Sequence, residues 1–540
     1  MTVHATVLLR NARIYTGDPA RPWAGALAAS GDRIVWLGDE GEAAAWAGPR
    51  VVQIDGGGRL ALPGLIDSHF HLLLGARTLG QLQLDDAPDL EDCQRRLHDY
   101  AAASPDREWL LGRGWKYSLF RGAPIHRRWL DAVVPDRPVL LTAFDGHTAW
   151  ANTAALARAA IGHGASTGSA SSIIVLDEAG EPTGELREGA AMRAVSRLVP
   201  PLTEADQTLL LRQALHDLAA LGLTGVHNMD GSEAQLALYQ GFAERSDLSL
   251  RVYLPLSITP GMDPARIDAW AALAGELRGP LLRAGCVKMF MDGVVESKTA
   301  YLLAPYADGS GERGVPDYSQ AEFDILCTRA DAQGLQIFTH AIGDAAVRAT
   351  LDGYAAARRA NGSRDSRHRV EHVELLDLAD LPRFAELGVL AAMQPLHANF
   401  GYDEQNPWRR LAGAERWAWG FPWRALRDAG AHLAFGSDWP VVSADPLRGI
   451  EAAQNRIKLD LSGAESSFPD QRISLAETIA AYTSGAAYAE FQEREKGILR
   501  EGMLADLVLL SENIFELPPE ALGKARVELT MLAGRVIYSK

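Results

Sequence analysis

Residues 202–230 read LTEADQTLLLRQALHDLAALGLTGVHNMD, a stretch that joins a helix and a strand in one short unit. Leucines recur at helical spacing after Thr203, whose residue type caps helix N-termini, and Gly222 is suited to end the helix. The apolar run that follows, LTGVHNM, is typical of a buried strand. The stretch therefore predicts a helix that leads directly into a strand of a parallel sheet.

The same helix-then-strand pattern recurs along the middle of the chain. Residues 318–344, YSQAEFDILCTRADAQGLQIFTHAIGD, contain a capping-box pattern at Ser319 and Glu322 and a helix stop at Gly334. The strands expected in the whole chain cover residues 60–71, 222–230, 249–258, 284–292, 334–340, 368–374, 388–397 and 431–438. Repeated βα units imply a parallel sheet, and eight strands are the number that closes a (β/α)8 barrel of the TIM type. We therefore predict an α/β fold built on such a barrel.

The two ends of the chain differ from this middle, because both are rich in short strands and turns. Residues 1–60 and 490–540 are predicted to pair into one small β-sandwich domain, which leaves residues 61–489 for the barrel. The gap between the first two barrel strands is far too long for one helix. Residues 80–200 are therefore expected to form an insertion after the first strand, over the mouth where barrel loops carry function.

Composition and charge exclude several classes of protein. The chain has 540 residues, and its net charge of −16 argues against nucleic acid or an anionic membrane as the main partner. Its three cysteines are widely separated, which excludes a disulfide framework and favours a reducing compartment. The N-terminus does not have the pattern of a signal peptide, and no run approaches the roughly 18 apolar residues of a membrane span. We expect a cytoplasmic protein.

Polar side chains stand at the ends of the expected barrel strands, which is the functional face of such a fold. His69 and His71 alternate on the first strand, so both imidazoles point to the same face. The other strand-end candidates are Lys288 on the fourth strand, His340 on the fifth, His372 on the sixth and Asp438 on the eighth. Histidine and carboxylate are good ligands for zinc and related divalent ions. A single strand-end histidine is more often structural, but the whole set predicts a metal site.

This set of residues resembles the amidohydrolase superfamily. The segments GLIDSHFH, DGHTAWAN, VKMFMDGVVESKTA, THAIGDAAV, RVEHVE and FGSDWPV, with the tail GILREGMLADLVLL, look like its YtcJ-like branch, which includes N-substituted formamide deformylase. The resemblance spans nearly the whole chain. It implies a (β/α)8 barrel with a metal centre at its C-terminal mouth, but it does not specify the substrate.

The resemblance also implies a reaction. His69 and His71 would hold one divalent ion, expected to be zinc, and His340 and His372 would hold a second. Lys288 stands where related hydrolases carry a carboxylated lysine that bridges two ions. Metal-activated hydroxide would attack the acyl carbon of an N-acyl or N-formyl amine, and Asp438 would bind metal and carry the proton to the departing amine. Many relatives form dimers, so a homodimer is expected by analogy.

Three further residues are weaker candidates for substrate binding. His147 lies in the segment DGHTAWAN, Trp115 in the insertion, and Asp292 four residues after Lys288. For His147 a local turn is an equally good interpretation, and Trp115 suits the core of the insertion.

Other functions remain open at this point. A hydrolytic deaminase of the same superfamily is disfavoured, because Asp344 stands near where such enzymes commonly place a glutamate. An ester, carbamate or lactone hydrolase uses the same chemistry and stays open. An inactive assembly protein would show loss of ligands, whereas all six ligand positions are filled by competent residue types.

Overall fold

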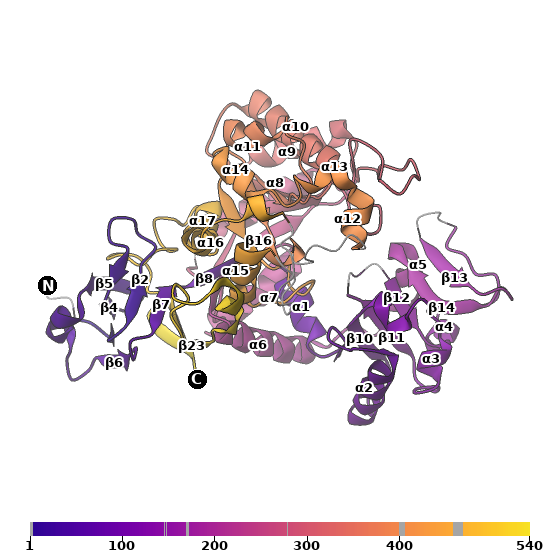
Figure 1. Cartoon of the computed structure of the whole chain (residues 1–540), viewed down its shortest axis with the longest axis horizontal. Coiled ribbons are helices and arrows are strands. Elements are labelled where there is room, and N and C mark those ends of the chain that lie inside the picture. Colours follow the sequence, from indigo (N-terminus) through magenta and orange to yellow (C-terminus); the bar gives the residue numbers. More distant parts are fainter. Residues whose placement is uncertain are drawn as a thin grey trace. The chain divides into compact units, whose positions relative to one another are not determined.

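The computed structural model describes residues 4–144, 146, 148–168, 172–277, 279–398, 406–456 and 468–540. The chain forms two compact units, one of Met1–His71 with Leu215–Lys540 and the other of Leu72–Ala214. Figure 1 shows both units coloured along the sequence.

Eight parallel strands form the central sheet of the first unit, in the order β21-β20-β19-β18-β17-β16-β15-β8. Their bounds are β8 Leu65–Phe70, β15 Leu223–Asn228, β16 Arg251–Ser257, β17 Leu282–Phe290, β18 Gln336–Ala341, β19 Arg369–His372, β20 Leu390–Met393 and β21 Leu433–Phe435. The two edge strands are joined where the chain leaves β21: the Asp67 carboxylate accepts the N–H of Ser437 at 3.0 Å, and the Asp438 N–H donates to the His69 carbonyl at 2.7 Å. The sheet is therefore a nearly closed barrel, and the predicted fold class is confirmed.

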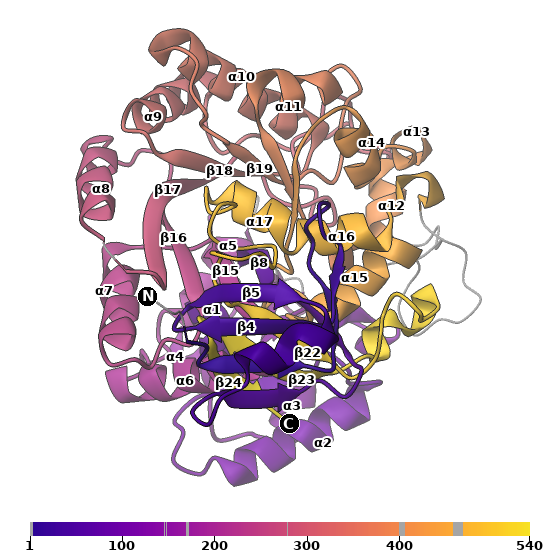
Figure 2. The same cartoon turned by 90° about the vertical axis from the view of Figure 1, so that its left-hand side faces the viewer.

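Helices connect the barrel strands, and the last ones follow β21. They are α6 Glu204–Ala220, α7 Glu233–Glu244, α8 Ala265–Glu276, α9 Gln320–Ala332, α10 Asp344–Asn361, α11 Leu381–Leu387, α12 Pro407–Ala412, α13 Ala414–Trp417, α14 Trp423–Asp428, α15 Pro446–Asn455, α16 Leu475–Ala481 and α17 Ser484–Ala489, with the 3-10 helices η3 Pro395–Ala398 and η4 Pro469–Gln471. Figure 2 shows α7 to α11 around the outside of β15 to β19. Within the described part of the chain, no helix combines the length and the apolar character required to cross a membrane.

The predicted helix ends are formed largely as expected. The Asp206 N–H donates to the Thr203 hydroxyl at the start of α6, and Ser319 caps α9 through the N–H of Glu322. The second half of the expected capping box differs, because the Glu322 carboxylate instead accepts the N–H of Gly261 at 2.9 Å. This acceptor ties α9 to the loop before α8 rather than to its own N-cap.

One predicted strand proves to be two. Residues 60–71 are divided at Gly64 into β7 (Leu60–Pro63) and β8, and β7 pairs with β22 (Leu507–Leu510) and with β2 (Arg13–Tyr15) in a different sheet. A Cβ atom on Gly64 would lie 2.4 Å from Oγ1 of Thr224, so only glycine allows this close approach to β15. An apolar run with one glycine did not reveal that the chain changes sheets there.

The two ends of the chain build two sheets with a shared core. The first has the order β24-β23-β22-β7-β2-β3, and the second has the order β5-β4-β1-β6. The remaining bounds are β1 Val7–Arg10, β3 Trp23–Ala24, β4 Ala26–Ser30, β5 Arg33–Gly38, β6 Val52–Asp55, β23 Val527–Leu532 and β24 Arg535–Ser539, with the 3-10 helices η1 Glu40–Trp46 and η5 Pro519–Lys524. Leu9, Ile14, Leu27, Leu507 and Met531 belong to one buried cluster, so apolar faces of both sheets pack together. These sheets belong to the same compact unit as the barrel, and the domain boundaries at residues 60 and 490 stay predictions.

The second unit, Leu72–Ala214, follows β8 directly and contains its own six-stranded sheet in the order β13-β14-β12-β11-β10-β9. Its elements are α1 Leu72–Thr78, β9 Leu82–Gln83, α2 Leu90–Ala103, β10 Leu110–Trp115, η2 Tyr117–Phe120, α3 Arg128–Asp131, β11 Val139–Ala143, β12 Thr148–Ala151, α4 Thr153–Arg158, β13 Ile173–Leu176, β14 Pro182–Arg187 and α5 Glu188–Ser196. The predicted insertion, residues 80–200, falls within this unit. Its placement over the barrel mouth stays a prediction.

Candidate metal centre

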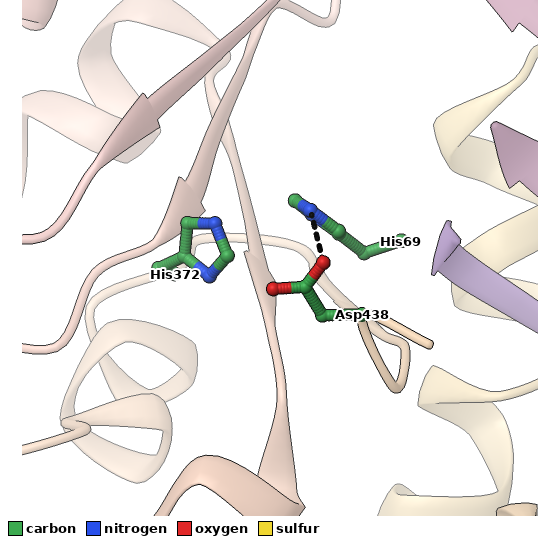
Figure 3. A group of neighbouring side chains, drawn as sticks. All are labelled: His69, His372 and Asp438. Atoms are coloured by element: carbon green, nitrogen blue, oxygen red, sulfur yellow. Dashed lines mark ion pairs between the residues drawn. The ribbon is translucent and has the colours of Figure 1, made fainter. Parts of the chain in front are cut away.

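Three side chains from separate strand ends meet in the barrel. His69 lies in β8, His372 ends β19, and Asp438 follows β21. One nitrogen or oxygen atom from each lies within 4.8 Å of the others, and all three residues are buried. Figure 3 shows the two imidazole rings and the carboxylate converging, with the Nε2 atom of His69 3.5 Å from Oδ1 of Asp438. Two imidazoles and a carboxylate are a suitable donor set for a divalent cation.

Two more of the predicted histidines lie against this group. The Nε2 atom of His71 is 3.2 Å from Oδ1 of Asp438, and its Nδ1 atom is 2.8 Å from the Asp230 carboxylate. The ring of His340 lies 4.3 Å from that of His372, centroid to centroid, and its Nε2 atom is 3.1 Å from the Gly293 carbonyl oxygen.

Lys288, the sixth predicted ligand, is fully buried in β17. Its positive charge acts to lower the pKa values of His69, His340 and His372. Burial lowers the pKa of Lys288 itself to about 8, although the nearby carboxylates oppose this shift. The Nζ atom lies 4.6 Å from the centre of the Phe290 ring and makes no hydrogen bond in the described part of the chain.

The electrostatics of the site favour neutral imidazoles. Burial, assisted by the charge of Lys288, lowers the pKa of His340 to about 3 and holds that of His69 far below its usual range. His71 behaves differently: burial acts to lower its pKa, but the carboxylates of Asp230 and Asp438 raise it to about 9. A cation bound at Nε2 of His71 would take the place of that proton. Neutral imidazole is the form that coordinates a metal.

Four of the predicted ligands have a buried polar atom to which the described residues give no hydrogen bond. Nε2 of His69, Nδ1 of His372, Nζ of Lys288 and Oδ1 of Asp438 are all buried, and none of them makes a hydrogen bond within the residues that the structure describes. An unpaired buried polar atom costs about 1–3 kcal/mol, so a cluster of them requires compensation. The residues present therefore fit a divalent cation.

Sequence reasoning missed the carboxylates that hold these histidines. Oε2 of Glu371 lies 2.6 Å from Nδ1 of His69, and the same carboxylate pairs with the Arg369 guanidinium at 2.8 Å; all three side chains are fully buried. Asp230 holds His71 in the same way. With Nδ1–H donated to a carboxylate, the Nε2 lone pair of each ring is free to bind a metal. The motif RVEHVE contains Glu371, but its residue type alone did not distinguish it from an ordinary strand residue.

A fifth histidine at the site was also missed. His397 lies in η3, which follows β20 closely, and its ring is stacked on that of His372 at 5.8 Å with an angle of 9°. Its Nε2 atom is 3.7 Å from Oδ2 of Asp438. The signal was present in the segment MQPLH, because His397 is the last residue of the seventh expected strand, 388–397, as His340 is of the fifth.

The weaker candidates for substrate binding have contacts that a structural role explains. Both carboxylate oxygens of Asp292 accept backbone N–H groups, from Tyr301, Ile342 and Gly343, and burial raises its pKa to about 8. Trp115 is fully buried in the core of the second unit and donates its indole N–H to the Leu141 carbonyl. Packing and loop support account for both residues, and a substrate contact by either stays a prediction. His147 lies outside the described residues.

Comparisons with known proteins agree with this geometry. A model of the amidohydrolase family matches residues 53–538. YtcJ of Bacillus subtilis (strain 168), which is named as an amidohydrolase, is 29% identical over 92% of this chain and 92% of its own length. N-substituted formamide deformylase of Arthrobacter pascens is 28% identical over 100% of this chain and 99% of its own length. A solved metal-dependent hydrolase of Pyrococcus furiosus is similar with a TM-score of 0.73 at 28% identity, covering 94% of this chain and 99% of that one. The resemblance inferred from the motifs is confirmed.

Proposed function

Because the chain belongs to the amidohydrolase family and is a hydrolase with a metal-dependent structural relative, we propose that it cleaves an amide-type C–N bond of a small molecule. The substrate class is an N-acyl or N-formyl amine. The observation that carries this proposal is the convergence of His69, His372 and Asp438 within 4.8 Å, all buried. The name of the deformylase relative, which acts on N-substituted formamides, supports the choice of bond.

In this proposal His69, His71, His372 and Asp438 would hold a divalent cation, with zinc as the first choice, and His340 and Lys288 would contribute to a second ion where two are bound. When bound, the cation would polarise the substrate carbonyl and lower the pKa of the attacking water. The chain's own task is to keep the imidazoles neutral and oriented, which burial and the carboxylates of Glu371 and Asp230 accomplish.

Asp438 is proposed as the residue that moves the proton. Its Oδ1 atom faces His69 and His71, whereas Oδ2 points toward His397 and is available to a substrate. The carboxylate accepts a proton from the attacking water and returns it to the departing nitrogen, which is otherwise a poor leaving group. The hydroxyl of water remains on the acyl carbon as the C–N bond breaks, so the products are a carboxylic acid and an amine.

Lys288 is proposed to be carboxylated. Its lowered pKa keeps a fraction of the buried amine neutral, and the neutral nitrogen adds to carbon dioxide and loses one proton, which forms a carbamate. The carbamate would supply two oxygen donors at a point where the structure has an unpartnered buried Nζ.

The alternative of a deaminase receives no support from Asp344. Its Oδ1 atom accepts the N–H groups of Leu303 and Ala345, so that oxygen is engaged with the backbone at the start of α10. Ester and carbamate hydrolysis remain outcomes of the substrate test.

The first experiment measures metal content per chain, by elemental analysis of protein purified without chelator, together with release of amine from N-formyl and N-acetyl amines. Two ions in the parent that fall to one or none in Lys288→Ala support a lysine-bridged centre. One ion in both proteins makes Lys288 a neighbour of a single-ion site. No metal, and none taken up from added zinc, refutes the proposed function. Lys298→Ala, which removes a part-exposed lysine paired with Asp308, is the matched control.

A further inference from the structure

A cavity of about 350 Å³ lies in the first unit, between the segment that follows β19 and the short helix α13. The described residues that line it include none of the six predicted metal ligands, so the cavity is separate from the metal centre. Cavities that bind small molecules have volumes of roughly 300–1,000 Å³. This cavity is therefore large enough to hold a small organic molecule.

One part of the cavity wall is apolar and rests on a fixed backbone. Leu375 forms an isolated antiparallel bridge with Gly420, and its N–H donates to the Ile342 carbonyl at 3.0 Å. Leu378 and Trp419 add apolar surface that water reaches, because Leu378 is 50% exposed and Trp419 is only half-buried. A hydrocarbon group that covered this surface would be stabilised by its removal from water. This part of the wall therefore suits the apolar body of a ligand.

The other part of the wall is acidic. Asp344, Asp377 and Glu415 contribute three carboxylates, and Arg416 is the one basic residue among the described residues that line the cavity. The charge of Asp377 is partly balanced from outside the cavity by Arg348, whose Nη2 atom lies 3.2 Å from its Oδ1 atom. Glu415 is exposed at the start of α13. The excess of negative charge favours a cationic ligand over a neutral or anionic one.

Asp344 directs one carboxylate oxygen toward a ligand. The residue is 9% exposed, and its Oδ1 atom accepts the N–H of Leu303 at 2.8 Å. Its Oδ2 atom lies 3.8 Å from Nε of Arg416, which is too far for a hydrogen bond. The two terminal nitrogens of Arg416 donate instead to the carbonyls of Ala412 and Ala304, at 2.6 and 2.8 Å. A buried carboxylate oxygen placed in this way suits an N–H donor with a positive charge.

We propose that this cavity binds a small organic cation, an ammonium group attached to a hydrocarbon body. The hydrocarbon covers Leu375 and Leu378, and the ammonium group lies among the carboxylates, within reach of the indole face of Trp419. An inorganic cation would leave the apolar wall exposed, and a neutral molecule would leave the Oδ2 atom of Asp344 without a charged donor. Binding here does not depend on the proposed hydrolysis, although the amine which that reaction releases belongs to the same chemical class.

The test compares three ligands with one hydrocarbon body and different charges: cyclohexylammonium, cyclohexanol and cyclohexanecarboxylate. We measure the Kd of each for the protein as purified, at pH 7, by ligand-observed NMR titration. The amine carries its proton at this pH, because alkylammonium groups have pKa values near that of lysine. Since a hydrogen bond to a charged group is stronger than a neutral one, cyclohexylammonium should bind roughly 10-fold more tightly than cyclohexanol. Cyclohexanecarboxylate should bind most weakly.

Two variants locate the binding. Leu378→Arg places a positive charge and a longer side chain at a half-exposed position of the wall and should weaken cyclohexylammonium binding at least about 10-fold. Glu415→Gln removes one exposed carboxylate and should weaken cyclohexylammonium by about 3-fold while the Kd of cyclohexanol stays unchanged. The matched controls are Ile325→Arg, at an apolar residue of α9 that is 62% exposed, and Glu512→Gln, at an exposed glutamate after β22. Both controls should keep the parental affinities.

Several results would overturn the proposal. Equal affinity for cyclohexylammonium and cyclohexanol would show that the carboxylates do not select a cation. Undiminished cyclohexylammonium binding in Leu378→Arg would place the binding elsewhere on the chain, and an equal loss in Ile325→Arg would show that it follows net charge alone. No measurable binding of cyclohexylammonium would refute the site. None of these results bears on metal content or amide hydrolysis, so the proposed function is tested separately.

Discussion

Replacing Glu371 with glutamine tests how the fold supports the metal centre. The glutamine has nearly the shape of glutamate but carries no charge, so it removes the carboxylate that accepts Nδ1–H of His69 at 2.6 Å. The same change deprives Arg369 of its buried ion-pair partner at 2.8 Å. The substitution therefore has two separate consequences, one for metal binding and one for stability.

The magnitudes follow from these two contacts. A residue that orients a metal-bound histidine changes metal affinity by roughly 10- to 100-fold, and we expect Glu371→Gln to weaken binding by that factor because His69 loses its fixed tautomer. Removing one partner of a fully buried ion pair costs about 3–5 kcal/mol, since an uncompensated charge remains. We expect the free energy of unfolding of the metal-free protein to fall by that amount.

Zinc affinity is measured on the folded variant by competition with a chromophoric chelator, and stability by urea unfolding of the metal-free protein. The matched control is Glu490→Gln, which removes a buried carboxylate paired with Lys496 and placed 3.3 Å from His227. We expect the control to lose similar stability and to keep parental metal affinity. If Glu371→Gln also kept parental affinity, its carboxylate would serve the fold alone and the role assigned to it through His69 would be wrong.

Three further predictions concern the scaffold. Burial acts to raise the pKa of Asp331, but hydrogen bonding with His368 and other neighbours lowers it to about 2. The stability that the Asp331 carboxylate contributes is therefore complete above about pH 4 and is lost as the pH falls toward 2. Asp331→Asn should cost about 2 kcal/mol of unfolding free energy in urea at pH 7, and this difference from the parent should shrink as the pH is lowered from 4. Gly64→Ala should lower the unfolding free energy by about 1–3 kcal/mol, because the added Cβ would clash with Thr224. Adding Thr224→Ala should restore part of that loss, and no recovery would show that the strain arises elsewhere. The Asp292 carboxylate accepts backbone N–H groups, so Asp292→Asn should lower thermal stability and reduce kcat/KM by the same factor for every substrate. A reduction that differs between substrates would instead favour the predicted substrate contact.

The barrel could be predicted because its signal is local. Several βα units contain a helix cap or a helix stop beside an apolar strand, and each of the eight predicted strands overlaps one of β8 and β15 to β21. The pairing of the chain ends into shared sheets could be inferred only because both ends are rich in short strands and turns. The change of sheet at Gly64 depends on a contact with Thr224, which is distant in sequence, and no local pattern encodes that distance.

The candidate ligands were visible for a related reason. Histidine and aspartate at the ends of parallel strands must come together if the strands form a barrel, so strand position alone predicts their meeting. Glu371 and Asp230 did not stand out, because acidic residues at the ends of strands are common on any surface. Their role appears only when the partner side chain is known, as with Nδ1 of His69 for Glu371.

On the sixth strand, the regular alternation of side chains does not predict which residues contact His69. Glu371 and His372 are consecutive, so a regular strand would direct them to opposite faces. In the structure both contact His69, Glu371 through its carboxylate and His372 with ring centroids 4.6 Å apart. The backbone explains this: His372 has φ = 75° and Val373 has φ = 47°, in the left-handed region that β-branched and bulky residues rarely adopt. Asp438, just after the eighth strand, also has a left-handed backbone, with φ = 63°, where it approaches His69. Strain of this kind persists only where the surrounding structure over-determines it and is concentrated at functional sites. The irregular backbone at the ends of the sixth and eighth strands therefore brings the candidate ligands His372 and Asp438 close to His69 and its supporting carboxylate, Glu371.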